Sequence, residues 1–374
     1  MGISRRDLVC LFGCFFLNEK LFSQDWTDSI ITEEDKYFPP KEASFYKKLD
    51  NKRIECNLCP LKCRVADKER GACGARENRD GYYYTLVHSR VCSAHIDPIE
   101  KKPLFHFLPG TEAFSIATPG CNMWCKFCQN WEISQFRPEQ VSCKYLPPKS
   151  IMEIGEKYKT PTIAFTYSEP VIFTEYLLDI SKLKEKYKKK CVSISNGFIE
   201  EEPLKRWVEN LDAIKIDLKA FKDKFYEEIT GGNLKSILKT LEFIKKNNVW
   251  LEIVVLLVPT LNDSKDEIKN LCSWVLKNLG KDVPVHFTRF HPTYRIKNLP
   301  PTPVSTLEEA RNIGLDVGLN YVYTGNVPGH KGEKTYCPNC KKVLIDRYAF
   351  QILSLNLKDG KCAFCGYEIK GVWK

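Results

Sequence analysis

The chain has 374 residues, 43% of them hydrophobic and 28% charged, which is the composition of an ordinary globular protein. Its 20 glycines and 21 prolines form no repeat, which excludes collagen-like and low-complexity sequences, and no apolar run reaches the roughly 18 residues that span a bilayer. The net charge of +10 is compatible with nucleic acid but usually marks a solvated surface. The 17 cysteines are odd in number and clustered, which favours metal ligation over a disulfide framework.

Residues 1–30 contain a pair of arginines, Arg5 and Arg6, followed by an apolar stretch from Leu8 to Leu17. This order resembles a twin-arginine signal, which would direct a folded protein to export or attach it to a membrane. The apolar stretch is short, and no small-residue cleavage pattern follows it. We therefore expect an apolar N-terminal segment in a cytoplasmic protein, with export as the alternative.

Residues 31–110 are expected to form an N-terminal cysteine-rich module. Four cysteines stand within eighteen residues of this segment: Cys56, Cys59, Cys63 and Cys73. Thiols this close together, outside a short secreted protein, are typical of metal ligands. Their spacing fits both zinc and an auxiliary iron–sulfur cluster and does not decide between the two.

Strand and helix signals alternate through residues 111–330. In one expected helix, Leu204, Trp207, Val208 and Leu211 form a single apolar stripe. Such alternation predicts an α/β fold with a parallel sheet, either open or closed into a barrel. The expected strands are Phe114–Thr118, Thr162–Tyr167, Val192–Ser195, Ala213–Leu218, Leu251–Val258, Val285–Phe290 and Tyr321–Thr324.

Three cysteines directly follow the first of these strands: Cys121, Cys125 and Cys128. In parallel α/β proteins, the loops at the carboxyl ends of the strands build the active site. Three thiolates can hold three irons of a [4Fe–4S] cluster and leave the fourth iron open to another ligand. The alternatives are a zinc site, which usually has four protein ligands when it is structural, and buried free cysteines.

The strand expected at residues 213–218 carries charge on one face. Lys215, Asp217 and Lys219 alternate with apolar residues, and side chains alternate between the two faces of a strand. We therefore expect the charged residues at the mouth of a barrel and the apolar residues in its packing. A later strand similarly places Arg289 and His291 on one face.

Residues 331–374 contain two C-x2-C pairs, separated by twenty-one residues. Two such pairs form a tetrahedral four-thiolate site, and a module this small has too little core to fold well without a metal. Zinc is the expected metal, and a rubredoxin-like iron is the alternative. The four expected ligands are Cys337, Cys340, Cys362 and Cys365.

The triad, with Phe127 before its last cysteine, resembles the radical S-adenosylmethionine (SAM) superfamily. Motifs at the ends of the next three strands resemble those of the enzymes that activate glycyl-radical enzymes. Three further stretches are similar to the radical SAM enzymes of the AmmeMemoRadiSam system, and this similarity runs from about Cys56 to Trp373. The strand-end motifs are Thr166–Pro170, Ser195–Phe198 and Asp217–Lys219, and the further stretches are Arg70–Asn78, Asp97–Pro103 and Cys128–Gln135.

The resemblance implies a partial (β/α) TIM-like barrel, preceded by the cysteine-rich module and followed by a zinc-ribbon-like module. It implies that Cys121, Cys125 and Cys128 bind a [4Fe–4S] cluster, which cleaves SAM reductively to a 5′-deoxyadenosyl radical that abstracts hydrogen. Glu169 would bind the ammonium of SAM, and Lys219 would lie near its carboxylate. The residues implied in SAM binding are Ser168, Glu169, Ser195, Asn196, Asp217, Lys219 and His291.

The sequence therefore predicts a radical SAM enzyme with an unknown substrate, for which the resemblance favours a peptide or protein. It also implies AMMECR1-like and Memo-like partner proteins and an electron donor such as flavodoxin or ferredoxin. One rival function is activation of a glycyl-radical enzyme, which would leave a stable glycine radical on a partner. Another is a zinc-containing nucleic-acid-binding protein, which would bind RNA or DNA in a salt-dependent way and form no 5′-deoxyadenosine.

Overall fold

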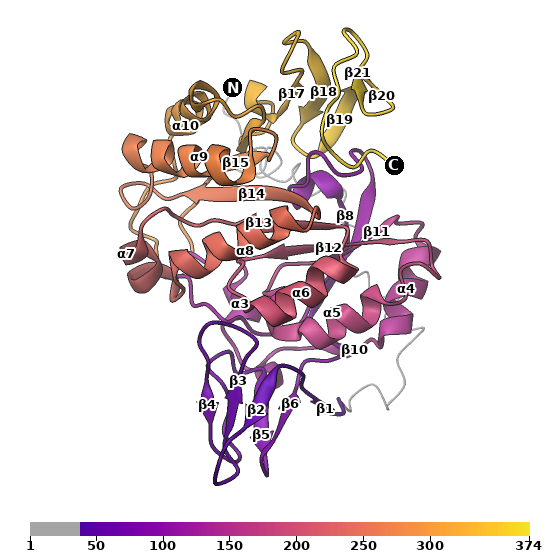
Figure 1. Ribbon diagram of the computed structural model, residues 1–374, viewed down its shortest axis with the longest axis vertical. Coiled ribbons are helices and arrows are strands. Elements are labelled where there is room, and N and C mark those ends of the chain that lie inside the picture. The colour runs from indigo at the N-terminus through magenta and orange to yellow at the C-terminus, as the bar shows by residue number, and fades with distance from the viewer. Residues whose placement is uncertain (1–37) are drawn as a thin grey trace, which may run out of the picture.

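The structure is a computed structural model that describes residues 38–374 of the chain (Figure 1). The apolar segment and the twin-arginine-like pair expected at residues 1–30 lie outside the described residues. Across 38–374, no helix combines the length and the apolar character needed to cross a membrane.

A central sheet of eight strands, in the order β16-β15-β14-β13-β12-β11-β9-β8, organises the fold. Strands β9 to β16 of this sheet run parallel, and β8 pairs antiparallel with β9 at one edge. The α/β class is confirmed, and within the described residues the sheet is open, with β8 and β16 as its edges. The strands are β8 (Ser93–Pro98), β9 (Glu112–Ala117), β11 (Thr162–Phe165), β12 (Lys190–Ser195), β13 (Ala213–Asp217), β14 (Trp250–Leu257), β15 (Val285–Arg289) and β16 (Val322–Gly325).

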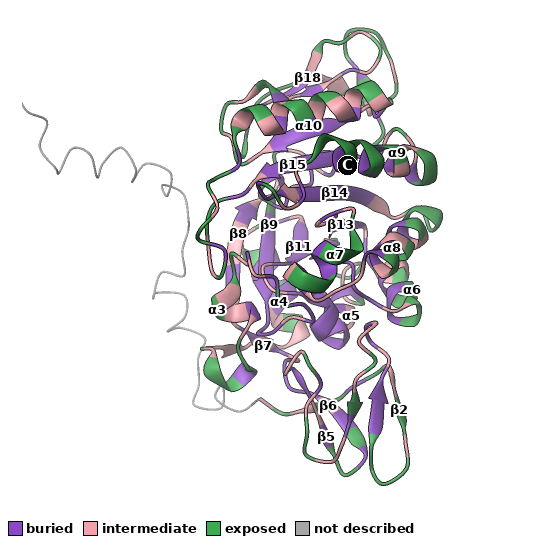
Figure 2. Cartoon of the chain, turned by 90° about the vertical axis from the view of Figure 1, so that its left-hand side faces the viewer, coloured by how far each residue is buried: buried purple, intermediate pink, exposed green. Residues whose placement is uncertain are grey.

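Amphipathic helices cover the sheet. In α6, Leu204 and Trp207 of the expected apolar stripe are buried, Leu211 directly after the helix is buried, and Val208 is half-buried. Figure 2 shows buried residues on the sheet and exposed residues on the outer faces of α9 and α10. Because helices cover the strands, apolar runs such as Trp250–Leu257 are almost entirely buried. The main helices are α4 (Pro148–Lys157), α5 (Thr174–Ser181), α6 (Glu201–Asn210), α8 (Leu234–Lys246), α9 (Lys265–Leu279) and α10 (Val304–Val317).

The central sheet begins before residue 111, where the barrel segment was expected to start. Strand β8 was expected to belong to the cysteine-rich module, but it pairs with β9 from Ser93 opposite Ala117 to Pro98 opposite Glu112. After β8, a short 3-10 helix, η3 (Ile99–Lys101), leads the chain back to β9. The module therefore ends near residue 92, and the segment after it belongs to the sheet.

The N-terminal cysteine module, which we define as residues 38–92, consists of very short strands at one end of the molecule (Figure 1). It contains two three-stranded sheets, β1-β6-β5 and β2-β3-β4. The buried Arg76 joins it to α5, because its Nη2 lies 2.5 Å from Oε2 of Glu175. The strands are β1 (Lys41–Glu42), β2 (Tyr46–Lys48), β3 (Ile54–Cys56), β4 (Arg64–Val65), β5 (Arg76–Arg79), β6 (Tyr82–Thr85) and β7 (Arg90–Val91), which pairs with β10 (Lys144–Tyr145).

The C-terminal ribbon, residues 331–374, lies at the opposite end of the molecule (Figures 1 and 2). It packs on the segment that follows β8. The buried Arg347 donates to the Phe105 carbonyl at 2.8 Å, and the Val372 amide donates to the His106 carbonyl at 2.8 Å. The ribbon strands are β17 (Thr335–Tyr336), β18 (Val343–Tyr348), β19 (Gln351–Leu355), β20 (Leu357–Lys358) and β21 (Lys361–Cys362).

Candidate active site

A cavity of about 460 Å³ lies at the carboxyl ends of the parallel strands. This is the edge of a parallel sheet where active sites form. The cavity brings together residues from the cysteine loop after β9 and from the ends of β11, β12 and β13. The residues expected from the sequence that line it are Cys121, Cys125, Cys128, Ser168, Glu169, Ser195, Asn196, Asp217 and Lys219.

The cysteine loop turns sharply at Gly120, which has a φ of +108°. A Cβ atom at this position would lie 3.2 Å from the carbonyl oxygen of Cys73, so the turn and the close approach both require glycine. Further along, the Trp124 amide donates to the Thr230 carbonyl at 2.9 Å, in the segment after β13. The loop that carries the triad thus lies against the cysteine module on one side and is held by the segment after β13 on the other.

The three thiols have an environment that suits metal ligation. Burial raises the pKa of all three thiols, to about 11 for Cys125, whereas the charge of Lys219 lowers the pKa of Cys125 and Cys128. Two N–H groups point at Cys121 Sγ, the Met123 amide at 3.4 Å and the Asn196 side chain at 3.8 Å. Soft thiolates supported by N–H donors are the usual ligands of iron–sulfur clusters, so the triad fits three corners of a [4Fe–4S] cluster.

Glu169 is a buried carboxylate just after β11, and three donors hold it. The Val171 amide and the Ser195 hydroxyl donate to Oε1 at 3.0 and 2.6 Å, and the Asn196 amide donates to Oε2 at 2.8 Å. Burial raises the pKa of Glu169 to about 7, although the donors oppose the rise. A carboxylate offers about four acceptor positions, so Glu169 retains capacity for one further donor such as an ammonium.

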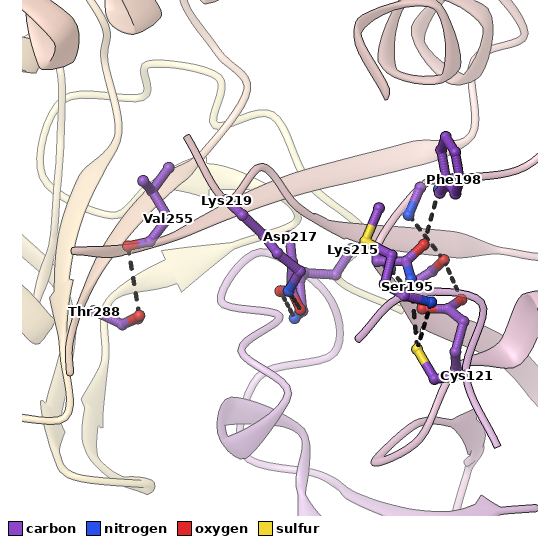
Figure 3. A network of polar contacts seen from close by, with 12 residues as sticks. Cys121, Ser195, Phe198, Lys215, Asp217, Lys219, Val255 and Thr288 are labelled. Atoms are coloured by element: carbon purple, nitrogen blue, oxygen red, sulfur yellow. Dashed lines mark hydrogen bonds and ion pairs between the residues drawn. The ribbon is translucent and has the colours of Figure 1, made fainter. Parts of the chain in front are cut away.

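At the end of β13, Asp217 contacts both neighbouring lysines (Figure 3). The Lys215 ammonium is in contact with Oδ1, and Lys219 Nζ lies 3.5 Å from Oδ2. Burial opposes the ionisation of Asp217, but the two lysines outweigh it and lower the pKa of this carboxyl. Lys219 Nζ also lies 5.8 Å from the ring centroid of Phe127, so it places a positive charge beside the cysteine loop.

His291, which was expected to bind SAM, is exposed and does not line the cavity. It follows β15, which ends at Arg289, and side chains of a strand alternate between its faces. Thr288 lines the cavity from this strand, whereas Arg289 donates from Nε to the Thr302 carbonyl at 2.9 Å. The face of β15 that meets the cavity is therefore the one that carries Thr288, and Arg289 and His291 belong to the opposite face.

The structure adds Lys102 to the cavity from the segment that follows β8. Its ammonium lies 2.5 Å from Oδ2 of the buried Asp97, and the Tyr167 hydroxyl donates to the same oxygen. Burial lowers the pKa of Lys102 to about 8, although Asp97 opposes this shift. The stretch from Asp97 to Pro103 resembles a family motif, and this resemblance is the sequence signal that could have pointed to Lys102.

The four ribbon thiols converge tightly. Cys337 Sγ lies 3.6 Å from Cys365 Sγ, and Cys340 Sγ lies 3.7 Å from Cys362 Sγ. Zinc–sulfur bonds of about 2.3 Å in a tetrahedron give sulfur separations of ~3.8 Å, so these thiols fit a single zinc ion. Within residues 38–374, this is the one group of metal-binding side chains whose ligand atoms all lie within 4.8 Å of one another.

Two isolated cysteines are neighbours in the fold. Val91 pairs with Lys144 between β7 and β10, and Cys92 and Cys143 are the next residues on these two segments. Burial raises the pKa of Cys92, and Cys143 raises it further. Their closeness could not be seen in the sequence, where they stand far apart. Cys191 and Cys272 are buried in the core.

The chain is similar to several known proteins and to one protein family. The structure of a radical SAM methyltransferase from Sphaerobacter thermophilus aligns at a TM-score of 0.48 with 12% identity, covering 84% of this chain and 86% of that one. The pyruvate formate-lyase-activating enzyme of Clostridium pasteurianum is 26% identical over 180 residues, which are 46% of this chain and 72% of that enzyme. An uncharacterized protein of Methanocaldococcus jannaschii is 44% identical over 331 residues, 88% of this chain and 98% of that protein. The sequence profile of the radical SAM superfamily matches residues 115–274.

Proposed function

This chain belongs to the radical SAM superfamily and is a radical SAM enzyme, and from that premise we propose that its triad holds a [4Fe–4S] cluster that cleaves SAM. The bound cluster would supply the electron that splits SAM into methionine and a 5′-deoxyadenosyl radical, which abstracts hydrogen from the substrate. One observation carries the proposal: three thiols from a single loop, Cys121, Cys125 and Cys128, open on a cavity that also holds carboxylates and amines.

Glu169 would bind the ammonium of SAM. Its three donors from the protein fix the orientation of the carboxylate and leave one acceptor position. Ser195 and Asn196 act through Glu169, because both donate hydrogen bonds that fix its carboxylate in position. Burial around the carboxylate excludes water and strengthens its attraction for a cation.

Lys219 would attract the carboxylate of SAM. It lies between Asp217 and the cysteine loop, where the positive charge also stabilises the thiolates of Cys125 and Cys128. Asp217 keeps Lys219 charged, because their attraction outweighs burial and raises the pKa of the lysine. The two ends of the zwitterionic methionine moiety would thus meet opposite charges.

We propose a peptide or protein substrate, which the resemblance to the AmmeMemoRadiSam system suggests, with AMMECR1-like and Memo-like proteins as candidate partners. A groove of about 890 Å³ supports this, because it shares Cys121 and Met123 with the cavity and extends toward the cysteine module. Arg70 and Arg137 line it, and Trp124 is 45% exposed beside it. The polar lining of this groove suits the backbone of an extended chain better than a small metabolite, whose sites are mostly apolar.

The experiment is an assay for 5′-deoxyadenosine after anaerobic reconstitution with iron and sulfide, in the presence of SAM and dithionite. We expect the wild-type chain to form it, and the variant Cys125→Ala to form none. Cys143→Ala is the matched control, because this half-buried thiol lies outside the cavity. Candidate partners and flavodoxin or ferredoxin would then be added, and a rise in SAM turnover identifies the substrate. Full activity in Cys125→Ala contradicts the proposal.

A second candidate function is the activation of a glycyl-radical enzyme. The relative from Clostridium pasteurianum, which is named as the activating enzyme of pyruvate formate-lyase, favours it. This function predicts a stable glycine radical on a partner, observed by electron paramagnetic resonance, and one SAM consumed per partner chain activated. Continuous SAM turnover without a protein radical would favour the first candidate.

We also propose that the ribbon binds zinc for stability. Its sulfur separations suit a tetrahedral zinc ion, and its short strands provide little core.

A further inference from the structure

The four cysteines of the N-terminal module surround one small void. Cys56 ends β3, Cys59 and Cys63 lie in the turn between β3 and β4, and Cys73 lies in the loop before β5. The void has a volume of about 10 Å³, and all four cysteines line it. All four are free thiols, so no disulfide competes for them. The topology of the module thus brings the whole set to a single point.

Each of the four thiols accepts a hydrogen bond from a backbone N–H group. The amides of Leu58, Leu61 and Ala75 lie two residues beyond Cys56, Cys59 and Cys73 and hydrogen-bond to their sulfurs. The fourth amide, that of Ala72, lies 3.5 Å from Cys63 Sγ. Cys121 of the triad has the same arrangement, with the amide of Met123 two residues beyond it. Such donors stabilise thiolates and tune clusters that thiolates bind.

The spacing of these thiols is wider than a single ion would need. Among the described residues, no three of them have sulfurs that all lie within 4.8 Å of one another, in contrast to the ribbon. The void between them has about the room that one water-sized sphere requires. Zinc lies ~2.3 Å from each of its sulfurs, which is closer than a water-sized sphere can approach them. Neither this set nor the triad, both within the part of the chain that the structure describes, has the tight convergence of the ribbon thiols.

The surroundings of the set offset negative charge. The buried guanidinium of Arg76 lies close enough to Cys56 and Cys73 to lower the pKa of both thiols, against the effect of burial. Its partner Glu175 is itself negative, so the pair offsets less than one full charge of the thiolates. Asn122, which follows Cys121 in the triad loop, hydrogen-bonds to Cys59 from the other side. The two cysteine sets are therefore adjacent, with Asn122 between them.

From this geometry we infer that Cys56, Cys59, Cys63 and Cys73 bind a second iron–sulfur cluster of the [4Fe–4S] type, closed by four thiolates. Because every iron has a protein ligand, this cluster offers no open corner to SAM. The inference goes beyond the proposed function and does not depend on it, since the second cluster needs no residue of the cavity.

The test removes the three thiols of the triad and measures how much iron the protein still binds. The triple variant Cys121→Ala/Cys125→Ala/Cys128→Ala is reconstituted anaerobically, and its iron, sulfide and zinc are measured together with its Mössbauer spectrum. We expect about four irons and about four sulfides per chain, against about eight of each in the wild type. Adding Cys59→Ala to the triple variant should remove the remaining iron, whereas adding Cys143→Ala should leave it.

Two results overturn the inference. One is a triple variant without iron that retains a native circular dichroism spectrum, and the other is zinc at twice the chain concentration, which would assign zinc to the module as well as to the ribbon. Should the triple variant fail to fold, the wild-type chain decides, because about four irons per chain with a fully active triad leave none for the module. Loss of SAM cleavage in the triple variant bears only on the proposed function.

Discussion

The ribbon and the triad loop hold cysteines in two different ways. In the ribbon, two pairs of sulfurs lie 3.6 and 3.7 Å apart, and the four thiols together can fill all four coordination positions of a tetrahedral metal. In the triad loop, three thiols line a cavity of about 460 Å³. Closed four-ligand sites are typical of metals that stabilise a fold, and sites with an open position are typical of catalysis. On the proposed assignments, the same residue type would serve stability at one end of the molecule and chemistry at its centre.

The charges around the two sets follow the same division. Glu169 is buried beside the triad, and Asp217 and Lys219 are half-buried there, so the charges influence one another strongly. The charged groups near the ribbon thiols are mostly solvated lysines such as Lys341 and Lys342. Of these two cysteine sets, the triad is the one beside which a ligand that carries both signs of charge would find complementary partners. The comparison suggests a rule for such clusters: the spacing of the cysteines points to a metal site, and charged residues beside the cysteines point to a site that binds a charged ligand.

The sharpest way to break this comparison is to remove one thiol from each set. We expect Cys128→Ala to abolish 5′-deoxyadenosine formation while the ribbon keeps its zinc, because a two-thiolate remnant cannot retain the cluster. The measurement combines the nucleoside assay with zinc analysis. If Cys128→Ala forms 5′-deoxyadenosine at the wild-type rate, the triad is not the catalytic site.

The opposite variant is Cys340→Ser, which should release the ribbon zinc and unfold residues 331–374 before the rest of the chain. The reason is that metal binding supplies much of the folding free energy of so small a module. Hydrogen exchange followed by mass spectrometry would locate the loss of protection. Cleavage of SAM should continue at low temperature, and a complete loss of it with the sheet still protected would contradict a purely stabilising role.

A smaller effect is expected from Glu169→Gln. Loss of a charge-assisted hydrogen bond costs about 1.5–3 kcal/mol, so SAM should bind roughly 10- to 100-fold more weakly, with the cluster absorbance unchanged. Because the pKa of Glu169 is raised to about 7, the carboxyl is largely neutral below that pH and ionised above it. Wild-type affinity for SAM should therefore rise between about pH 6 and about pH 8, and the variant should lack this rise. Calorimetry at both pH values would decide, and equal wild-type affinities would contradict the assignment.

The smallest effect is expected from Lys102→Met. Its charge is already offset by Asp97 at 2.5 Å, so we expect SAM to bind less than about tenfold more weakly. Lys101→Met is the matched control, because Lys101 also pairs with Asp97 and lines the cavity but is more exposed. A loss in Lys101→Met that exceeds the loss in Lys102→Met would show that burial does not determine the contribution of these lysines.

Much of the fold could be predicted because its strands are apolar runs between amphipathic helices. Strand β8 escaped prediction, since His95 and Asp97 interrupt its apolar character and only pairing with β9 makes it a strand. In the site, the loop cysteines and the strand-end residues were placed correctly in the cavity because strand ends converge in a parallel sheet. His291 was not, because the cavity-facing side chain of β15 is Thr288, and the sequence pattern does not show which of the two alternating faces of this strand meets the cavity.

The most direct measurement is electron paramagnetic resonance of the reduced triad cluster with and without SAM, in the variant Cys56→Ala/Cys59→Ala. This variant leaves the triad as the source of any cluster signal. We predict a [4Fe–4S] signal that changes its g values when SAM is added, since SAM would bind the iron that lacks a protein ligand. A signal that SAM leaves unchanged at saturating concentration would contradict the account of an open, catalytic site at Cys121, Cys125 and Cys128.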